Sequence, residues 1–508
     1  MKTQILLSKN LLVMVINLYK RNFSFIIIIL LILISLHPLA VAYNYPYNYL
    51  GDDAFITLTY SKNIVNGKGF IFNHPPATLG TTTPLFAITV ALFSKLLSVD
   101  IRVIAVFLSA LCWIGIIWVF FIFRAVWNLR DWQVGIIALV IAGLGWRAWL
   151  QMEAYVFAFL LTLSFSLFYK KLYLLSGFTV NLLFLTRGEG VLLLPIFLAT
   201  TLIQNRVSKR PAKDLAVELS KLLIGFLAPM AIWFFYASYT FGSFLPNTLV
   251  AKRVQGLNNI IYTFFHYLTT KWIGIWIERY NVLWFMFVIG LFDSFTHNRK
   301  QLIWIVWISV YILGYSLLNV AGYDWYRLPI IFVLKVFVGL GLIRAIKELV
   351  RMLKIKSLFT IPLIVLTVLS FYTVIRPILH YQPWTGDKPR GESYIKLSQW
   401  FNDNTKAFES VAFVEVGYLG YYTNNKIVDL LGLVSPDIIP YIAEGDLSGG
   451  FWKYKPDYLV YMAEFDWILG FIIANPQFKL EYLAVMTLPG PWGTDLTIYK
   501  RRSSTVHN

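Results

Sequence analysis

The chain has 508 residues, of which 58% are apolar and only 14% are charged, and its mean hydropathy is +0.65. Soluble globular proteins contain about 25% charged residues, so this composition excludes a water-soluble enzyme. The formal net charge is +18, but membrane proteins collect Lys and Arg in their cytoplasmic loops. The basic balance therefore does not indicate a nucleic-acid partner. A single cysteine, Cys112, excludes an intrachain disulfide.

The first apolar segment, residues 23–43, follows the basic residues Lys2, Lys9, Lys20 and Arg21. A cleavable signal peptide has an apolar core of about 7–15 residues and a small-residue cleavage site. This segment is longer and shows no clear cleavage site. It is predicted to be a retained first membrane span, with the N-terminus in the cytoplasm.

Eleven apolar runs are predicted to cross a hydrocarbon core about 30 Å thick. They are residues 23–43, 101–123, 132–146, 154–169, 172–186, 190–204, 216–240, 280–296, 302–320, 328–346 and 357–375. Residues 84–98 are a further apolar run. Counting them as a span would place the Lys and Arg clusters of the later loops outside, against the positive-inside rule. Residues 84–98 are therefore predicted to lie in the membrane interface.

The tail, residues 376–508, differs from the rest of the chain. It has strand-like runs at 411–416 and 458–461 and is punctuated by Gly and Pro. An odd number of spans places it outside the membrane. The predicted fold class is an α-helical polytopic membrane protein, residues 1–375 with an outer loop at 44–100, followed by an extracytoplasmic α/β domain, residues 376–508.

The first polar grouping in the outer loops is the pair Asp52 and Asp53. Helix capping explains part of this pattern, with Asp52 as N-cap, Asp53 in the first turn and Gly67 at the end of the helix. Capping explains only one of two adjacent acids. At the edge of the membrane, desolvation can raise the pKa of a carboxyl group toward the working range of a general base. Both interpretations stay open at this point.

Four more groupings of charged residues fall in the predicted outer loops. Glu153 follows a segment rich in aromatics, where an interfacial anchor is an equally good explanation. The others lie in tight loops, where ionisable groups are costly and usually functional, and their members are Arg187, Glu189, Lys252, Arg253, Asp324 and Arg327. Acids and bases on one face of a helical bundle predict a site for an anionic substrate that is carried in the membrane.

The motifs at these positions resemble one branch of the GT-C integral-membrane glycosyltransferases. They are DDAFITLTYSKNIVNGKGFIFN, TTTPLF, QMEAYVFAFL, LTRGEG, FGSFLPNTLVAK, GYDWYRLP and, in the tail, VEVGYLGYYTNNKIVDLLGL. The branch includes the bacterial terminal arabinofuranosyltransferases, and lipid A aminoarabinose transferases and protein O-mannosyltransferases are more distant relatives. The resemblance implies an inverting transfer of a sugar, a pentose such as arabinofuranose or a hexose, from a polyprenyl-phosphate donor. The acceptor is a hydroxyl of a glycan, lipid or protein at the outer face of the bacterial cell membrane, in cell-envelope synthesis.

The resemblance also assigns roles to residues. The paired catalytic acids fall on Asp52 and Asp53, with the first as general base. The family's Met-Glu motif falls on Met152 and Glu153, with Gln151 where glycine is usual. The Thr-Arg-Pro-Glu-Gly pattern falls on residues 186–190, with Gly188 in place of proline. The remaining motif is matched in full by Pro246, Asn247, Thr248 and Lys252.

A departing lipid phosphate needs fixed donors that stabilise its growing charge. The candidate donors are Lys252, Arg187, Arg253 and Arg327, and Glu153, Glu189, Asn247 and Asp324 complete the predicted substrate-binding set. No cofactor is required. The paired acids could hold Mg²⁺ or Ca²⁺, but the Lys and Arg side chains of this set can neutralise the phosphate without a metal.

Two other classes of protein stay open. A transporter or flippase of a lipid-linked glycan would share the bundle, but it should show ionisable groups deep within spans or a repeated half, and the sequence suggests neither. A non-catalytic subunit that binds glycan is the other alternative, and the paired acids argue mildly against it.

Overall fold

The computed structural model describes residues 24–73, 77–143, 147–274, 281–353 and 385–502. The predicted span 357–375 and the predicted boundary between the two parts, at 375, lie outside these ranges. The other ten predicted spans fall on helices. Within the described ranges, six helices are long and apolar enough to cross a membrane: Ser24–Tyr43, α4 (Ile101–Ile122), Gly188–Ser208 with α8 (Leu193–Ser208), α9 (Ala212–Phe241), Arg299–Leu318 with α14 (Ile303–Leu318), and Asp324–Met352 with α15 (Leu328–Met352).

Within the described residues, four shorter apolar helices also belong to the bundle. They are α5 (Asp131–Gly143), α6 (Ala154–Tyr169), α7 (Tyr173–Thr186) and α13 (Asn281–His297). Short 3₁₀ turns adjoin several of the bundle helices at the end that faces the C-terminal domain, including η1 (Arg147–Gln151), η2 (Gly188–Leu192) and η5 (Asp324–Arg327). The expectation that no ionisable group lies deep within a predicted span is wrong. Lys335 lies inside α15, where it is buried with its ammonium 5.5 Å from the ring centroid of Trp149.

Close helix packing in the bundle depends on small residues. Gly177 of α7 faces Gly225 of α9, and a Cβ atom on either glycine would lie 2.2 Å from a carbonyl oxygen of the other helix. Larger side chains would force the two backbones apart, as is usual where membrane helices cross closely. This contact holds α9 against α7, whose C-terminal end carries Arg187.

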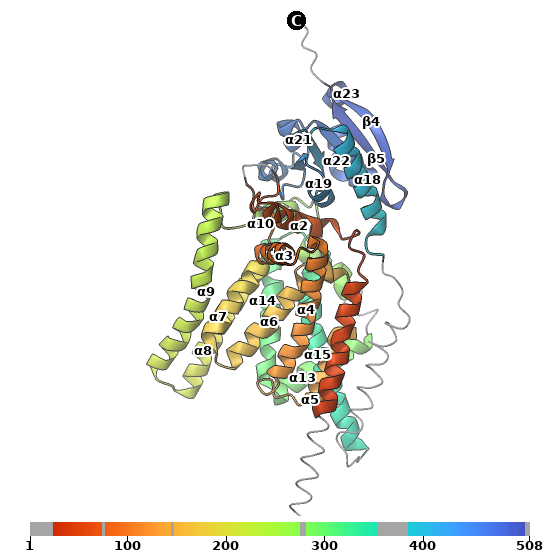
Figure 1. Ribbon diagram of the computed structural model, residues 1–508. Coiled ribbons are helices and arrows are strands. Elements are labelled where there is room, and N and C mark those ends of the chain that lie inside the picture. The colour runs from red at the N-terminus through yellow and green to blue at the C-terminus, as the bar shows by residue number, and fades with distance from the viewer. Residues whose placement is uncertain (1–23, 74–76, 144–146, 275–280, 354–384, 503–508) are drawn as a thin grey trace, which may run out of the picture.

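Three helices lie across the end of the bundle that faces the C-terminal domain, between the bundle and that domain (Figure 1). They are α2 (Asp52–Val65), α3 (Pro84–Leu97) and α10 (Asn247–Leu257). The helix α3 is the segment predicted to lie in the membrane interface. Its inner face is buried, whereas Leu92, Phe93, Leu96 and Leu97 are exposed. An apolar exposed face on a helix that runs across the bundle suits contact with lipid.

The C-terminal part is the α/β domain predicted from the tail. Its five-stranded sheet has the order β2-β1-β3-β5-β4. The strand β1 (Ser410–Phe413) pairs in parallel with β2 (Lys426–Asp429) and β3 (Tyr458–Met462), and β5 (Asp495–Arg501) pairs antiparallel with both β3 and β4 (Tyr482–Pro489). Its helices are α18 (Lys388–Asn404), α19 (Gly417–Tyr422), α20 (Ile439–Ala443), α21 (Gly449–Tyr454), α22 (Asp466–Ile473) and α23 (Pro476–Glu481). The strand predicted over 411–416 ends at Phe413, because Val416 already has helical backbone angles at the start of α19.

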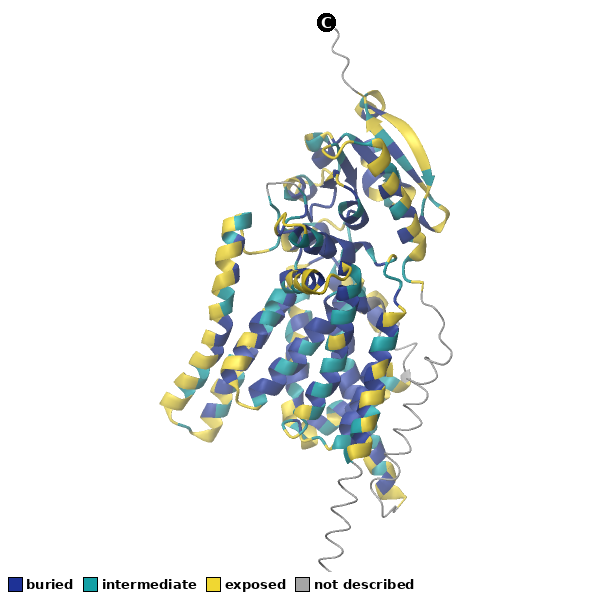
Figure 2. Ribbon diagram, viewed as in Figure 1, coloured by how far each residue is buried: buried dark blue, intermediate teal, exposed yellow. Residues whose placement is uncertain are grey.

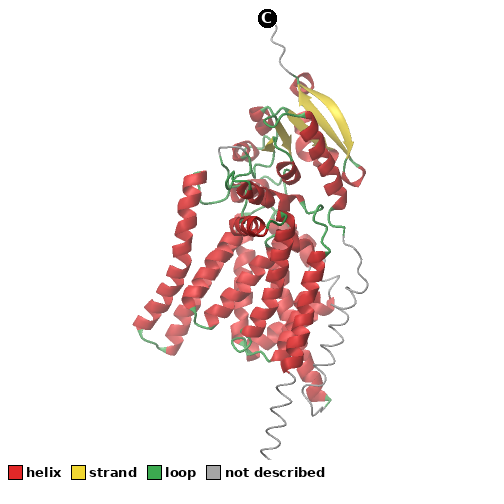
Figure 3. Ribbon diagram, viewed as in Figure 1, coloured by secondary structure: helices red, strands yellow, loops and turns green. Residues whose placement is uncertain are grey.

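The bundle and the C-terminal domain share one core. Buried apolar residues of the bundle, of α2 and of the sheet form a single connected cluster. In Figure 2 the buried residues continue through the junction between the two parts, and Figure 3 shows helices on the bundle side and the strands in the C-terminal domain. The junction is therefore a packed interface that can hold side chains in fixed positions.

Candidate active site

A cavity of about 350 Å³ lies at the junction between the bundle and the C-terminal domain. Its lining comes from α2, the segment before α3, the bundle helices, α10, and Leu433 of the C-terminal domain. Its charged lining residues are Asp53, Glu153, Arg187, Glu189 and Lys252. All five are among the site residues predicted from the sequence, so the fold gathers motifs that are up to 199 residues apart (53 to 252) into one space.

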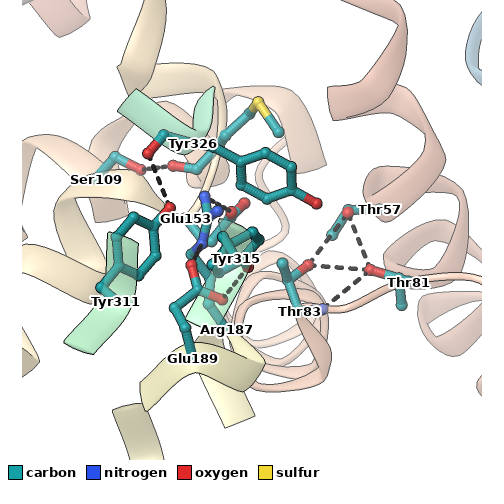
Figure 4. A network of polar contacts seen from close by, with 11 residues as sticks. Thr57, Thr81, Thr83, Ser109, Glu153, Arg187, Glu189, Tyr311, Tyr315 and Tyr326 are labelled. Atoms are coloured by element: carbon teal, nitrogen blue, oxygen red, sulfur yellow. Dashed lines mark hydrogen bonds and ion pairs between the residues drawn. The ribbon is translucent and has the colours of Figure 1, made fainter. Parts of the chain in front are cut away.

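Arg187 is held by two carboxylates (Figure 4). Its guanidinium lies 3.2 Å from Glu153 Oε1 and 2.5 Å from Glu189 Oε1, and the Tyr315 hydroxyl donates to Glu189 Oε2 at 3.0 Å. All three charged side chains are at most 5% exposed. The network joins the ends of α6, α7 and α14. Its two carboxylates outnumber its one positive charge. Arg187 therefore has its charge balanced before any phosphate arrives.

Lys252 has a different environment. Its ammonium lies over the rings of Tyr323, Trp325 and Tyr326, at 4.8, 5.1 and 5.4 Å from their centroids. Among the residues that the structure describes, none forms a hydrogen bond or an ion pair with the Lys252 ammonium. Aromatic faces attract a cation without neutralising it. Lys252 is thus the cavity cation whose charge is available to an anionic ligand.

Asp53 lies on the cavity side of α2. Burial raises the pKa of the Asp53 carboxyl above its ordinary value of 3.8, and the positive charges of Lys252 and then Arg390 oppose this rise. A carboxylate with a raised pKa is a stronger base than an exposed one. Asp53 and Lys252 therefore place a base and a cation in the same cavity.

Asp52 faces the other way. Its Oδ2 accepts a hydrogen bond from the backbone N–H of Gly417 at 2.9 Å, and its Oδ1 accepts one from Tyr418 at 3.0 Å. The cavity lining does not include it. Burial raises the pKa of Asp52 to about 6, although the two N–H groups favour its charged form.

The expected capping role of Asp52 is wrong in one respect. The N-cap of α2 is Gly51, and no side chain caps this helix. The Asp52 carboxylate instead lies at the N-terminus of α19, where it accepts the backbone N–H groups that open that helix. The role of general base that the resemblance gives to the first aspartate does not fit this position, because Asp52 lies outside the cavity.

The other four predicted residues do not line the cavity either: Asn247, Arg253, Asp324 and Arg327. Arg253 is exposed, since adjacent residues of a helix point about 100° apart and Lys252 faces inward. The side chain of Asp324 is 72% exposed and pairs with Arg327 at 3.5 Å. The backbone N–H of Asn247 donates to the carbonyl of Leu79 at 3.0 Å, which fixes the start of α10.

Several lining residues were not assigned from the sequence. Thr57, Thr81 and Thr83 form a cluster of hydroxyls. Two features of the sequence could have indicated these residues: the one-turn spacing from Asp53 to Thr57 and the run of threonines at 81–83. Leu433 comes from the C-terminal domain and had no local signal. Its loop is held where Gln255 donates to the carbonyl of Leu431 at 2.9 Å.

The described residues contain no group of three or more His, Cys, Asp or Glu side chains that could hold a metal ion. A role for Mg²⁺ or Ca²⁺ stays a prediction. The pair of acids at 52 and 53 does not converge on one point, since the two carboxylates face different surroundings.

Comparison with known proteins places this geometry in a known fold. Residues 381–503 match a protein family that is described as a domain of unknown function, DUF8728. No curated protein matches the chain. Among solved structures, the archaeal oligosaccharyltransferase AglB from Archaeoglobus fulgidus, in complex with an inhibitory peptide and a dolichol-phosphate, is similar with a TM-score of 0.58 and 13% identity, over 94% of this chain and 74% of AglB.

ArnT from Cupriavidus metallidurans, bound to undecaprenyl phosphate, is similar with a TM-score of 0.58 and 12% identity, over 93% of this chain and 97% of ArnT. These likenesses cover both the bundle and the C-terminal domain. They show that the chain has a GT-C-like fold, which it shares with AglB and ArnT. The narrower likeness to arabinofuranosyltransferases stays a prediction.

The contact between Asp52 and α19 predicts a measurable loss of stability. In Asp52→Ala two buried N–H groups lose their acceptor, at a cost of about 1–3 kcal/mol each. Gly417→Ala should disturb the same contact from the other side, because its Cβ would lie 1.9 Å from the Asp52 carbonyl oxygen. Both variants should lower the thermal unfolding midpoint of the purified protein, followed by tryptophan fluorescence, and expose the C-terminal domain to protease. Asp403→Ala, at an exposed position of α18, is the control. Unchanged unfolding of Asp52→Ala would contradict the contact.

Proposed function

We propose that this protein is an inverting glycosyltransferase that moves a sugar from a polyprenyl-phosphate donor to a hydroxyl acceptor at the outer face of a bacterial cell membrane. The observation that carries the proposal is the position of Asp53 and Lys252 in one cavity, between apolar helices and the C-terminal domain. A base and an unpaired cation at such a place suit the transfer of a sugar away from a lipid phosphate.

The cavity also has a surface for a lipid chain. Apolar lining residues come from α7, η2, α9, α10 and α14, and several of them are also exposed at the protein surface: Val191, Phe244, Leu245, Leu249 and Leu318. A prenyl chain could pass along these side chains into the bilayer while its phosphate stays at Lys252. The similar AglB and ArnT structures hold dolichol-phosphate and undecaprenyl phosphate, which supports a donor of this class.

The chemistry needs two groups. The Asp53 carboxylate takes the proton of the acceptor hydroxyl while the hydroxyl oxygen forms a bond to the anomeric carbon. The bond between that carbon and the phosphate oxygen breaks, and polyprenyl phosphate leaves with the electron pair. Lys252 stabilises the negative charge that grows on the phosphate. A single displacement from the opposite face inverts the anomeric configuration.

Other predicted residues take supporting roles in this proposal. Asp52 positions Asp53 by fixing the first turn of α2 against α19. The Arg187 network forms a rigid polar wall of the cavity. Asn247, Arg253, Asp324 and Arg327 lie outside the cavity lining and are left out of the proposed machinery.

The substrates follow from the resemblance of the motifs. A pentose such as arabinofuranose is the first candidate sugar, and a hexose is the second. The acceptor is a glycan, lipid or protein of the cell envelope, close to the C-terminal domain. In this proposal the N-terminus is cytoplasmic, the C-terminal domain is extracytoplasmic, and the transfer needs no metal.

Removing the carboxylate of Asp53 tests the proposal directly. With the full chain in proteoliposomes, supplied with polyprenyl-phosphate sugars and acceptor, Asp53→Asn should lower transfer about 10²–10⁴-fold, as expected for loss of a general base. Asp52→Asn keeps one acceptor oxygen for α19 and should lower transfer less. For the wild type, kcat/KM should fall with decreasing pH at a pKa above 3.8, because Asp53 must be ionised to act. Full transfer by Asp53→Asn would refute the assigned base.

Adjacent cations on α10 allow a matched test of phosphate binding. Lys252→Gln should lower kcat/KM for the lipid donor about 10²–10³-fold, similar to the loss of one donor to a developing anion. Arg253→Gln removes the same charge one residue away, outside the cavity, and should leave kcat/KM close to the wild-type value. Equal effects of the two substitutions would show that Lys252 acts only through general surface charge.

A further inference from the structure

The threonine cluster is a second polar feature of the cavity, separate from the charged network. The hydroxyl of Thr57 lies 3.2 Å from those of Thr81 and Thr83, and the last two lie 3.0 Å apart. All three residues are at least 92% buried and line the cavity. Three hydroxyls in mutual contact therefore form part of the wall of the proposed active site (Figure 4).

The cluster lies beside the proposed base. Thr57 follows Asp53 by four residues on α2, so the two side chains share one face of that helix. Figure 4 shows the Arg187 network on one side and the threonines on the other, with the hydroxyl of Tyr326 pointing toward the threonine side. A substrate group next to Asp53 would therefore meet uncharged hydroxyls on this side and charged groups on the opposite side.

The chemistry of the cluster suits a polyol. In a closed triangle each hydroxyl donates once and accepts once, and Thr81 also accepts the backbone N–H of Thr83 at 3.2 Å. The hydroxyls of Thr57 and Thr83 keep a free lone pair each, and either can turn to donate instead. They carry no charge and so offer little to a phosphate, which Lys252 serves. Sugar hydroxyls, which donate and accept at similar spacing, are the complementary group.

We propose that Thr57, Thr81 and Thr83 form the subsite that binds the hydroxyls of the sugar ring next to the reacting carbon, and so contribute to sugar specificity. This inference rests on the proposed glycosyl transfer. A site built to bond a substrate hydroxyl rejects an analogue that lacks it, because the polar groups of the site then lose a partner.

A purely structural role for the cluster makes a different prediction. The threonines join α2 to the start of α3, and Ser61 also joins these helices by donating to the carbonyl of Ala87 at 2.9 Å. Ser61 does not line the cavity. The Ser61 hydroxyl also lies 3.4 Å from the backbone carbonyl oxygen of Thr57, but it contacts none of the three threonine hydroxyls. Ser61→Ala is thus a matched control that removes bonds of the same helix interface and leaves the hydroxyls of the subsite in place. Thr59→Val, at a buried position of α2 away from the cavity, controls for valine in that helix.

The experiment compares Thr57→Val and Thr83→Val with both controls in proteoliposomes. Each reaction is supplied with polyprenyl-phosphate sugars and with deoxy analogues that lack one ring hydroxyl. Transfer to acceptor and hydrolysis of the donor without acceptor are measured separately. Each threonine variant should lower kcat/KM for the hydroxylated sugar about fivefold to tenfold, the value of one neutral hydrogen bond. One deoxy analogue should react poorly with the wild type yet suffer no further loss in the variant.

The two assays identify which sugar provides the hydroxyls. A loss in both transfer and hydrolysis supports the subsite for the donor sugar, whereas a raised KM for acceptor with unchanged hydrolysis would contradict it, because the threonines would then bind an acceptor sugar. Threonine variants that match Ser61→Ala and Thr59→Val with every sugar would overturn this inference alone. A wild type that transfers no sugar from any donor would overturn the proposed function, and this inference with it.

Discussion

Burial of the Asp52 carboxylate is the constraint on which the site depends. A buried carboxylate is costly unless hydrogen bonds satisfy it, and here two backbone N–H groups at the start of α19 do so. These hydrogen bonds therefore hold the first turn of α2 against the C-terminal domain. Because successive helical residues point about 100° apart, holding Asp52 toward that domain turns Asp53 and, one turn later, Thr57 toward the cavity.

The same cavity assigns different tasks to its two cations. Arg187 pairs with the carboxylates of Glu153 and Glu189, and Glu189 also accepts a hydrogen bond from the Tyr315 hydroxyl, so the charge of Arg187 stabilises the protein itself. Lys252 lies on three aromatic faces, which hold the ammonium in place, and none of the described residues forms an ion pair with it. The difference comes from the partners of each cation and not from its burial, since both side chains are buried. Only the second arrangement is ready to receive a phosphate.

Much of the architecture could be predicted from the sequence because the bilayer imposes a strong local signal. Apolar runs marked the helices of the bundle, and the change in composition near residue 376 marked a domain of another class. The resemblance of short motifs brought Asp53, Glu153, Arg187, Glu189 and Lys252 to attention, and the fold places all five in one cavity. In these cases a local pattern carried the information.

Features that depend on distant partners could not be predicted. The acceptor role of Asp52 involves Gly417, 365 residues away, and no local pattern states which of two adjacent acids faces the cavity. Lys252 and Arg253 differ only in the side of α10 on which they lie. The strand near 411 ends at Phe413, and the chain has helical backbone angles by Val416, where α19 begins beside Asp52. The buried Lys335 was overlooked because it is one charge in a long apolar run.

The central claim is that a lipid phosphate binds at Lys252, within reach of Asp53. The most direct measurement is a structure of the full chain in lipid nanodiscs with undecaprenyl phosphate bound. The account predicts phosphate density in hydrogen-bond contact with the Lys252 ammonium on the side that faces Asp53, and a prenyl chain along the apolar residues of α9, α10 and α14. A phosphate bound outside the cavity, with Lys252 contacting only its three aromatic rings, would contradict it.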